Sequence, residues 1–155
     1  MRNKKFRFAL IGVGVLLIFL SVMIINDHRE RNLGDLVKYK QGDFLMLGFT
    51  QGGIPEGKAF SWNNKDEEPA DELIEFLSKY HVKRISKDEY PVYFGSDIDM
   101  FHFTITHRNA NPVIMDVLED KVHFYVGDYY EVLNGPIDME WVAKYNEKYL
   151  NQYKE

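Results

Sequence analysis

An unbroken apolar run from Phe8 to Ile25 constrains this chain more than any other feature of its sequence. At about 1.5 Å of rise per residue, a helix of this length spans roughly 27 Å, close to the hydrocarbon thickness of a bilayer. The run contains no charged residue, and it is preceded by the basic residues Arg2, Lys4, Lys5 and Arg7. The pattern predicts a transmembrane helix over residues 8–25 that lies in the lipid bilayer.

A cleaved signal peptide is the alternative interpretation of this segment. Signal peptides combine a basic start with an apolar stretch of about 7 to 15 residues and a small-x-small cleavage site. The stretch in this chain is longer, and its last six residues (LSVMII) lack an Ala-x-Ala pattern. We therefore favour an uncleaved signal anchor, with a secreted protein as the alternative.

The placement of Lys and Arg predicts the orientation of the span, because basic residues concentrate on the cytoplasmic side. Four basic residues precede the apolar run, and four follow it at Arg29, Arg31, Lys38 and Lys40. The counts are equal, but the N-terminal group is more compact and lies closer to the run. We expect the N-terminus in the cytoplasm and the C-terminal domain outside the cell membrane.

The span divides the chain into four segments. These are a basic cytoplasmic N-terminus (1–7), the transmembrane signal anchor (8–25), a juxtamembrane connector (26–42) and an extracytoplasmic domain (43–155). The connector is polar and charged, with few apolar residues to bury. The remaining chain is long enough for one domain with its own core but not for two.

Charge and cysteine content exclude several classes of function. All 24 acidic residues, but only 15 of the 19 basic ones, lie beyond the apolar run. An acidic surface repels phosphate backbones, so nucleic acid is not expected as a partner. The chain has no cysteine, which excludes disulfides and thiol chemistry. A cysteine-free domain behind a membrane anchor is typical of a Gram-positive bacterial protein.

Alternating apolar and polar residues predict an antiparallel meander of three strands. The alternating runs occupy residues 101–106, 113–118 and 121–126, and turn sequences separate them. If Thr104 faces Asp116 and Asp116 faces His123, the strongly apolar side chains gather on one face of the sheet. A slip of one residue would destroy this arrangement, so we expect that register.

Two amphipathic helices are expected to cover the apolar face. The first begins near Pro69, and the second is capped by Asp138 and carries an apolar stripe made by Trp141, Val142, Tyr145, Tyr149 and Tyr153. Short strands at 43–50 and 82–85 complete the pattern. The expected fold is α+β: an N-terminal transmembrane helix, then one small domain with a β-meander packed against about two helices.

The outward face of the meander holds the candidate catalytic residues, Asp116 and His123. A carboxylate that orients an imidazole is a recurring acid–base unit. The order is wrong for a triad, however, because the acid lies between Thr104 and the imidazole, and no oxyanion motif accompanies it. With His102 the pair would offer metal ligands, but no usual zinc spacing appears. We expect neither a metal nor a cofactor, and an ordinary cross-strand polar cluster is the alternative.

Two further segments attract attention. The glycine-rich stretch 51–68 presents Phe60 and Trp62, which would stack on a sugar or anchor a peptide if exposed, and would pack into the core otherwise. Asp97 and Asp99 resemble the start of a calcium loop but lack the further ligands of an EF-hand.

These observations predict a single-pass, membrane-anchored protein that presents a small acidic interaction or sensing domain to a protein or envelope partner. An envelope hydrolase that uses Asp116 and His123 is the alternative. The lack of a catalytic motif favours the first interpretation.

Overall fold

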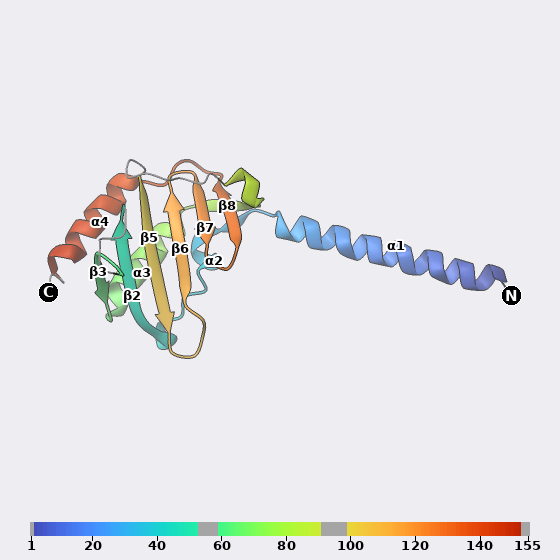
Figure 1. Cartoon of the computed structure of the whole chain (residues 1–155), viewed down its shortest axis with the longest axis horizontal. Coiled ribbons are helices and arrows are strands. Elements are labelled where there is room, and N and C mark those ends of the chain that lie inside the picture. Colours follow the sequence, from blue (N-terminus) through green and yellow to red (C-terminus); the bar gives the residue numbers. More distant parts are fainter. Residues whose placement is uncertain (1, 53–58, 91–98, 153–155) are drawn as a thin grey trace.

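The computed structural model describes residues 2–52, 59–90 and 99–152. A long helix, α1 (Arg2–Asp27), projects away from an α+β domain formed by the rest of the chain (Figure 1). The described residues form four α-helices, α1 included, and one antiparallel sheet of eight strands. The predicted fold class, α+β with an N-terminal apolar helix, is confirmed at this level.

From Leu10 to Ile25, helix α1 carries apolar side chains on all sides and is not buried against the domain. Its 18-residue segment Leu10–Asp27 is long and apolar enough to cross a membrane, and none of it is buried. It is the one such helix in the part of the chain that the structure describes. A signal sequence near an N-terminus can satisfy the same criteria of length and composition.

The sheet has the strand order β1-β4-β8-β7-β6-β5-β2-β3. The strands are β1 (Arg31–Asn32), β2 (Phe44–Gln51), β3 (Trp62–Asn64), β4 (His81–Ile85), β5 (Met100–His107), β6 (Val113–Leu118), β7 (Lys121–Phe124) and β8 (Asp128–Val132). The predicted meander is present as β5, β6 and β7 and continues into β8. It lies in the middle of the sheet, because β2 pairs with β5 on one side and β4 pairs with β8 on the other.

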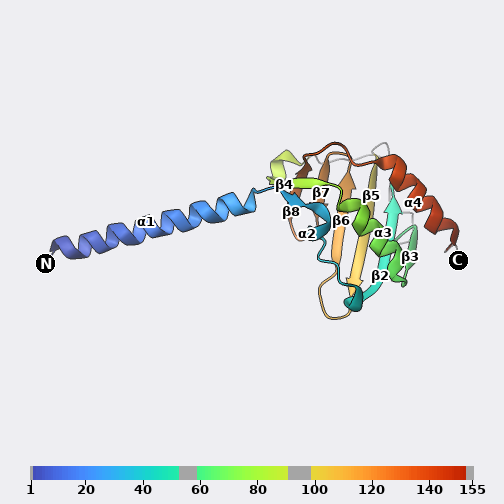
Figure 2. The same cartoon turned by 180° about the vertical axis from the view of Figure 1, so that it is seen from behind.

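Helices α3 (Glu67–Leu77) and α4 (Met139–Gln152) lie on one face of the sheet, together with the short α2 (Leu33–Leu36) (Figure 2). Two short 3₁₀ turns, Gln41–Asp43 and Lys87–Glu89, precede β2 and follow β4. The predicted cap of the last helix is confirmed, since the Asp138 carboxylate accepts a hydrogen bond from the Trp141 backbone N–H at 2.9 Å. Both predicted helices are therefore present.

The core lies between the helices and the inward-facing residues of the sheet. Phe101, Phe103 and Ile105 of β5 are fully buried, as the alternation predicted. Aromatic rings join the layers: the Phe49 and Trp62 centroids lie 5.2 Å apart, and Phe49 meets Tyr145 of α4 edge-on at 5.2 Å. Such ring pairs stabilise a core beyond the area that they bury.

The predicted register between β5 and β6 is wrong by two residues. His102, not Thr104, lies opposite Asp116, and Thr104 lies opposite Ile114. A shift of two residues leaves every side chain on its face, so alternation alone could not distinguish the two registers. The observed register places Phe101 beside Val117 and Phe103 beside Met115, and all four side chains are fully buried.

The segment expected as a connector contributes to the domain from Arg31 onward. Strand β1 pairs with β4, and the Leu33 backbone N–H donates to the Tyr80 carbonyl at 2.9 Å. Leu33 and Val37 are fully buried in the core. Residues 31–37 of this segment therefore pack with the domain in the structure. A strand of two residues and a helix of four are too short to produce a readable periodicity.

Candidate functional site

The sheet face opposite α3 and α4 carries a polar cluster formed by His102 of β5, Asp116 of β6 and His123 of β7. The three residues lie opposite one another on neighbouring strands. The His102 Nδ1 lies 2.7 Å from the Asp116 Oδ1, whereas the His123 Nδ1 lies 3.6 Å from the Asp116 Oδ2. One carboxylate therefore lies between two imidazoles, with a close hydrogen bond to His102.

Partial burial and hydrogen bonding oppose each other at Asp116. Its side chain is only 17% exposed, and burial by itself would raise its pKa. Hydrogen bonds from His102 and from the Tyr125 hydroxyl, together with the nearby imidazoles, outweigh burial and hold the pKa below the usual range. The carboxylate is therefore ionised at neutral pH. Burial and the adjacent carboxylate raise the pKa of Tyr125.

Aromatic rings surround the two imidazoles. The His123 ring stacks on Tyr129, with centroids 4.5 Å apart and planes 3° from parallel. Phe60 lies over Gly48 with its centroid 6.3 Å from that of His102. A Cβ atom at position 48 would come within 2.6 Å of the Phe60 ring, so the close approach requires glycine. These contacts favour a packed structural role for the cluster.

The arrangement does not assemble a nucleophile with its base. A triad needs a hydroxyl beside the imidazole, but Thr104 lies between Gly48 and Ile114 on the neighbouring strands. Among the residues that the structure describes, no group of three or more His, Asp or Glu side chains is arranged to hold a metal ion. A catalytic role for Asp116 and His123 stays a prediction.

The two aromatic residues predicted to bind a ligand lie on opposite faces of the sheet. Trp62 is 3% exposed and donates its Nε1–H to the Asn146 Oδ1 at 2.9 Å, so it packs in the core, as the alternative interpretation held. Phe60 is half-buried on the other face, and its role in binding stays a prediction. Residues 53–58, as well as Asp97 and Tyr153, lie outside the described residues.

The C-terminal end of α1 is held against the domain by ion pairs and hydrogen bonds that centre on Arg84 of β4. The Arg84 guanidinium pairs with Asp128 of β8 and lies 3.7 Å from the Asp27 carboxylate of α1. The His28 Nδ1 lies 3.2 Å from the Arg84 carbonyl oxygen. A cavity of about 610 Å³ adjoins this joint. The described end of α1 therefore contacts the sheet through exposed polar side chains.

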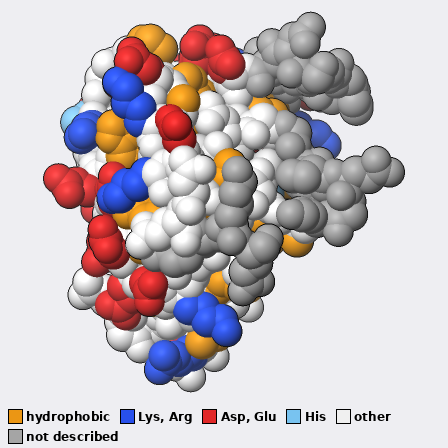
Figure 3. Space-filling model, turned by 90° about the vertical axis from the view of Figure 1, so that its left-hand side faces the viewer, with side chains coloured by type: hydrophobic (Ala, Val, Ile, Leu, Met, Phe, Trp, Pro, Cys, Tyr) orange, Lys and Arg blue, Asp and Glu red, His pale blue; other side chains and the backbone are white. Residues whose placement is uncertain are grey.

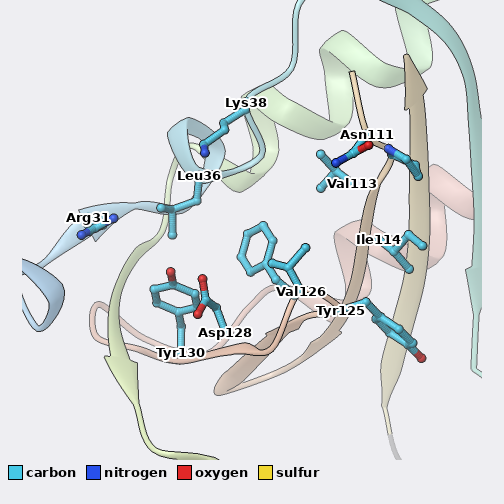
Figure 4. A pocket seen from close by; sticks show the side chains of 12 residues that line it. Arg31, Leu36, Lys38, Asn111, Val113, Ile114, Tyr125, Val126, Asp128 and Tyr130 are labelled. Carbon is cyan, nitrogen blue, oxygen red and sulfur yellow. The ribbon is translucent and has the colours of Figure 1, made fainter. Parts of the chain in front are cut away.

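A second cavity, of about 370 Å³, lies between α2 and the turn that joins β7 to β8 (Figure 4). Its wall combines side chains from residues 31–38, 111–114 and 124–130. Sequence reasoning missed it because these segments are remote in the chain and meet only after the sheet forms. The one local signal was the pair of cations Arg31 and Lys38, which counted only toward orientation.

The opposite end of the domain, around α4, carries acidic and basic side chains interspersed with one another (Figure 3). Lys148 of α4 lies 2.7 Å from the Glu72 carboxylate of α3, and Lys144 pairs with Glu140 at the same distance. These exposed pairs contribute little to stability individually. They distribute the charge of this surface instead of concentrating one sign.

No protein-family model, curated protein or solved structure matches this chain. The fold itself defines an α+β protein with an eight-stranded antiparallel sheet that follows an apolar helix.

Proposed function

We propose that this protein is a single-pass membrane protein in which α1 anchors a small interaction or sensing domain at the outer face of the cell membrane. The observation that carries the proposal is the exposure of α1. Its large apolar side chains are exposed by 45% at Leu20 to 72% at Phe8. A continuous apolar surface of this extent is unfavourable in water and is typical of contact with lipid or a partner.

The composition of α1 favours insertion across the bilayer over adsorption to its surface. The thirteen Leu, Ile, Phe and Val residues between Phe8 and Ile25 each favour insertion by about 0.3 to 0.6 kcal/mol near the helix centre, a total of roughly 4 to 8 kcal/mol. A helix that lies in the interface has one apolar and one charged face. Apolar residues surround α1, so a spanning position satisfies more of its surface.

The domain suits a role in which it meets a partner near the membrane. Confinement to the membrane plane raises its effective concentration toward other anchored molecules, so a modest intrinsic affinity suffices. Its excess of acidic residues repels an anionic lipid surface and keeps the domain accessible. The ion pairs of Arg84 support a sensing role, because they connect β4 and β8 with the end of α1.

Fractionation of cells that express the full chain tests the anchor. The wild type is expected to stay with the membrane after alkaline carbonate extraction. Two arginines, in the variant Leu17→Arg/Ile18→Arg, together cost about 5 to 7 kcal/mol at the centre of a span and should release the chain. The control Leu133→Arg changes an exposed residue of the domain and should remain bound. A wild type recovered in the soluble fraction contradicts the proposal.

Orientation is tested with single cysteines, because the chain has none of its own. Val126 is 81% exposed, and a Val126→Cys variant should react with a membrane-impermeant maleimide on intact cells. The control Asn3→Cys should react only after lysis. The mass of the labelled chain distinguishes an uncleaved anchor from a cleaved signal peptide. Labelling of Asn3→Cys but not of Val126→Cys on intact cells would show the opposite orientation and contradict the proposal.

A further inference from the structure

The cavity between α2 and the β7–β8 turn has an apolar wall and a cationic wall. Arg31, Leu36 and Lys38 lie on the side of α2, while Val113 of β6 and Val126 lie across from them (Figure 4). Its volume of about 370 Å³ falls in the range of small-molecule sites. Such sites are mostly apolar, with a few polar groups that orient the ligand.

Arg31 brings an unsatisfied positive charge to this cavity. Its Nη2 donates to the Asn26 carbonyl at 3.0 Å, but its Nε is buried without a hydrogen-bond partner among the described residues. Within the same residues, no carboxylate lies within 4.0 Å of its guanidinium. A buried donor without a partner is rare in folded proteins. Because Arg31 lines the cavity, an anion there would pair with the charge of its guanidinium.

Lys38 holds the second cation in an unfavourable backbone conformation. Its φ is +52°, and it follows the C-cap of α2, a position that normally takes glycine. A side chain with a Cβ is strained there, and strain of this kind concentrates at functional sites. Lys38 lines the cavity, so this conformation places its side chain at the cavity wall.

The one carboxylate of the wall does not cancel these charges. Asp128 is paired with Arg84, which belongs to the joint with α1. Burial and then the Asp128 charge raise the pKa of the neighbouring Tyr130, while Arg31 opposes them. The Tyr130 hydroxyl therefore stays protonated at neutral pH and remains a hydrogen-bond donor.

We propose that this cavity binds an amphipathic anion, that is, a carboxylate or phosphate joined to an aliphatic body. The anionic group lies between Arg31 and Lys38, and the aliphatic body packs against Leu36, Val113 and Phe124. Charge-assisted hydrogen bonds fix the anionic head of the ligand. The apolar wall binds its aliphatic body with little selectivity, because hydrophobic contact is not directional.

The source of the ligand rests on the proposed membrane anchor. Arg31 is four residues beyond Asp27, so the chain places it within about 14 Å of the end of α1. If α1 spans the bilayer, this distance puts the cationic wall at the level of the lipid headgroups. Amphipathic anions are concentrated there, both as membrane lipids and as free carboxylates that partition to the surface.

Calorimetric titration of the full chain tests the inference. The protein is placed in nanodiscs of zwitterionic lipid, with empty nanodiscs as the blank for partitioning. Octanoate and octyl phosphate are expected to bind at least about tenfold more tightly than octanol, because only they engage the two cations. Equal affinity for octanoate and octanol, or preference for octylammonium, would overturn the proposal.

The variant Lys38→Gly separates the loss of a binding group from damage to the fold. Glycine relieves the strained backbone, so the melting temperature should be unchanged or higher. The Kd for octanoate should nevertheless rise at least about fivefold. The control Lys79→Gln removes an equal charge at an exposed site outside the cavity and should leave the Kd within about twofold. An unchanged Kd in Lys38→Gly overturns the proposal.

A second titration distinguishes the two sources. In nanodiscs that contain phosphatidylglycerol, a lipid occupant would compete and weaken octanoate binding, whereas a free amphiphile would bind as before; either result supports the shared chemistry. Failure of the membrane anchor can be distinguished from failure of anion binding. If the chain proves soluble, the same titration can be carried out in buffer without nanodiscs. An anchored chain that binds no anion refutes this inference alone.

Discussion

The truncation Leu33→Ala measures how firmly the segment after α1 belongs to the domain. Leu33 begins α2, is fully buried and packs within the main core. Helix α2 lies so close to the end of α3 that a Cβ at Gly34 would meet the Ser78 Oγ at 2.0 Å. Neighbouring groups therefore have little freedom to fill the space that the removed side chain leaves.

The structure sets the size of the expected effect. Removal of a fully buried leucine side chain costs about 2.7 to 5 kcal/mol, and the upper half of this range applies where the site cannot collapse. We expect a loss of about 4 kcal/mol, which lowers the melting temperature of a domain of this size by roughly 10 to 16 °C. The backbone hydrogen bond from Leu33 to Tyr80 is kept, so the side chain alone is tested.

Tryptophan fluorescence of the full chain in detergent during denaturant unfolding reports the change. Both tryptophans, Trp62 and Trp141, lie in the domain and none lies in α1, so the signal follows the domain alone. The control Leu45→Ala removes the same atoms from a side chain that is 41% exposed and should cost less than about 1 kcal/mol. Equal losses in the two variants would show that residues 31–37 do not form part of the core, and the reasoning would fail.

Three further outcomes follow from side chains of the sheet and of α4. Because the pKa of Asp116 is depressed in the folded state, the stability that its charge contributes is complete above about pH 4 and is lost as the pH falls through the folded pKa. Asp116→Asn should therefore cost about 1 kcal/mol at pH 7 in denaturant unfolding, and the cost should shrink as the pH falls below about 4. Gly48→Ala should lower the free energy of unfolding by about 1 to 3 kcal/mol, because the added methyl group collides with the Phe60 ring. In a double-mutant cycle, the second substitution Phe60→Ala should remove part of this loss. Burial raises the pKa of Tyr149 to about 12, so Tyr149→Phe should leave the tyrosinate absorbance unchanged below about pH 11.

Regular patterns explain which parts of the fold could be predicted from the sequence. The strands of the meander alternate strictly, and α3 and α4 carry apolar residues at helical spacing, so their positions follow from local chemistry. Strands β1 and β3 have two and three residues and acquire their structure only by pairing with β4 and β2. Their existence is a tertiary effect that no local pattern contains.

The polar cluster likewise has one feature that the local pattern predicts and one that depends on tertiary pairing. Its location on the outward face follows from the period of the strands, and the pairing of Asp116 with His123 was predicted correctly. The closer partner of the carboxylate is His102, which lies two residues along β5 from Thr104. Choosing between them requires the register, and the register depends on which buried side chains fit together across the strands.

The segment around Lys38 lies between α1 and the core and also lines the cavity. A chain selected for stability alone would place glycine after α2, and a chain selected only for a connector would bury neither Leu33 nor Val37. The observed segment does both: it docks into the core and presents two cations next to the end of α1. Because Arg84 holds Asp128 of the cavity wall as well as Asp27 of α1, an anion that enters the cavity acts on residues already joined to the helix. If α1 is the proposed anchor and the cavity binds the proposed anion, this continuity favours a domain that senses amphiphiles at the membrane surface over one that the helix merely tethers.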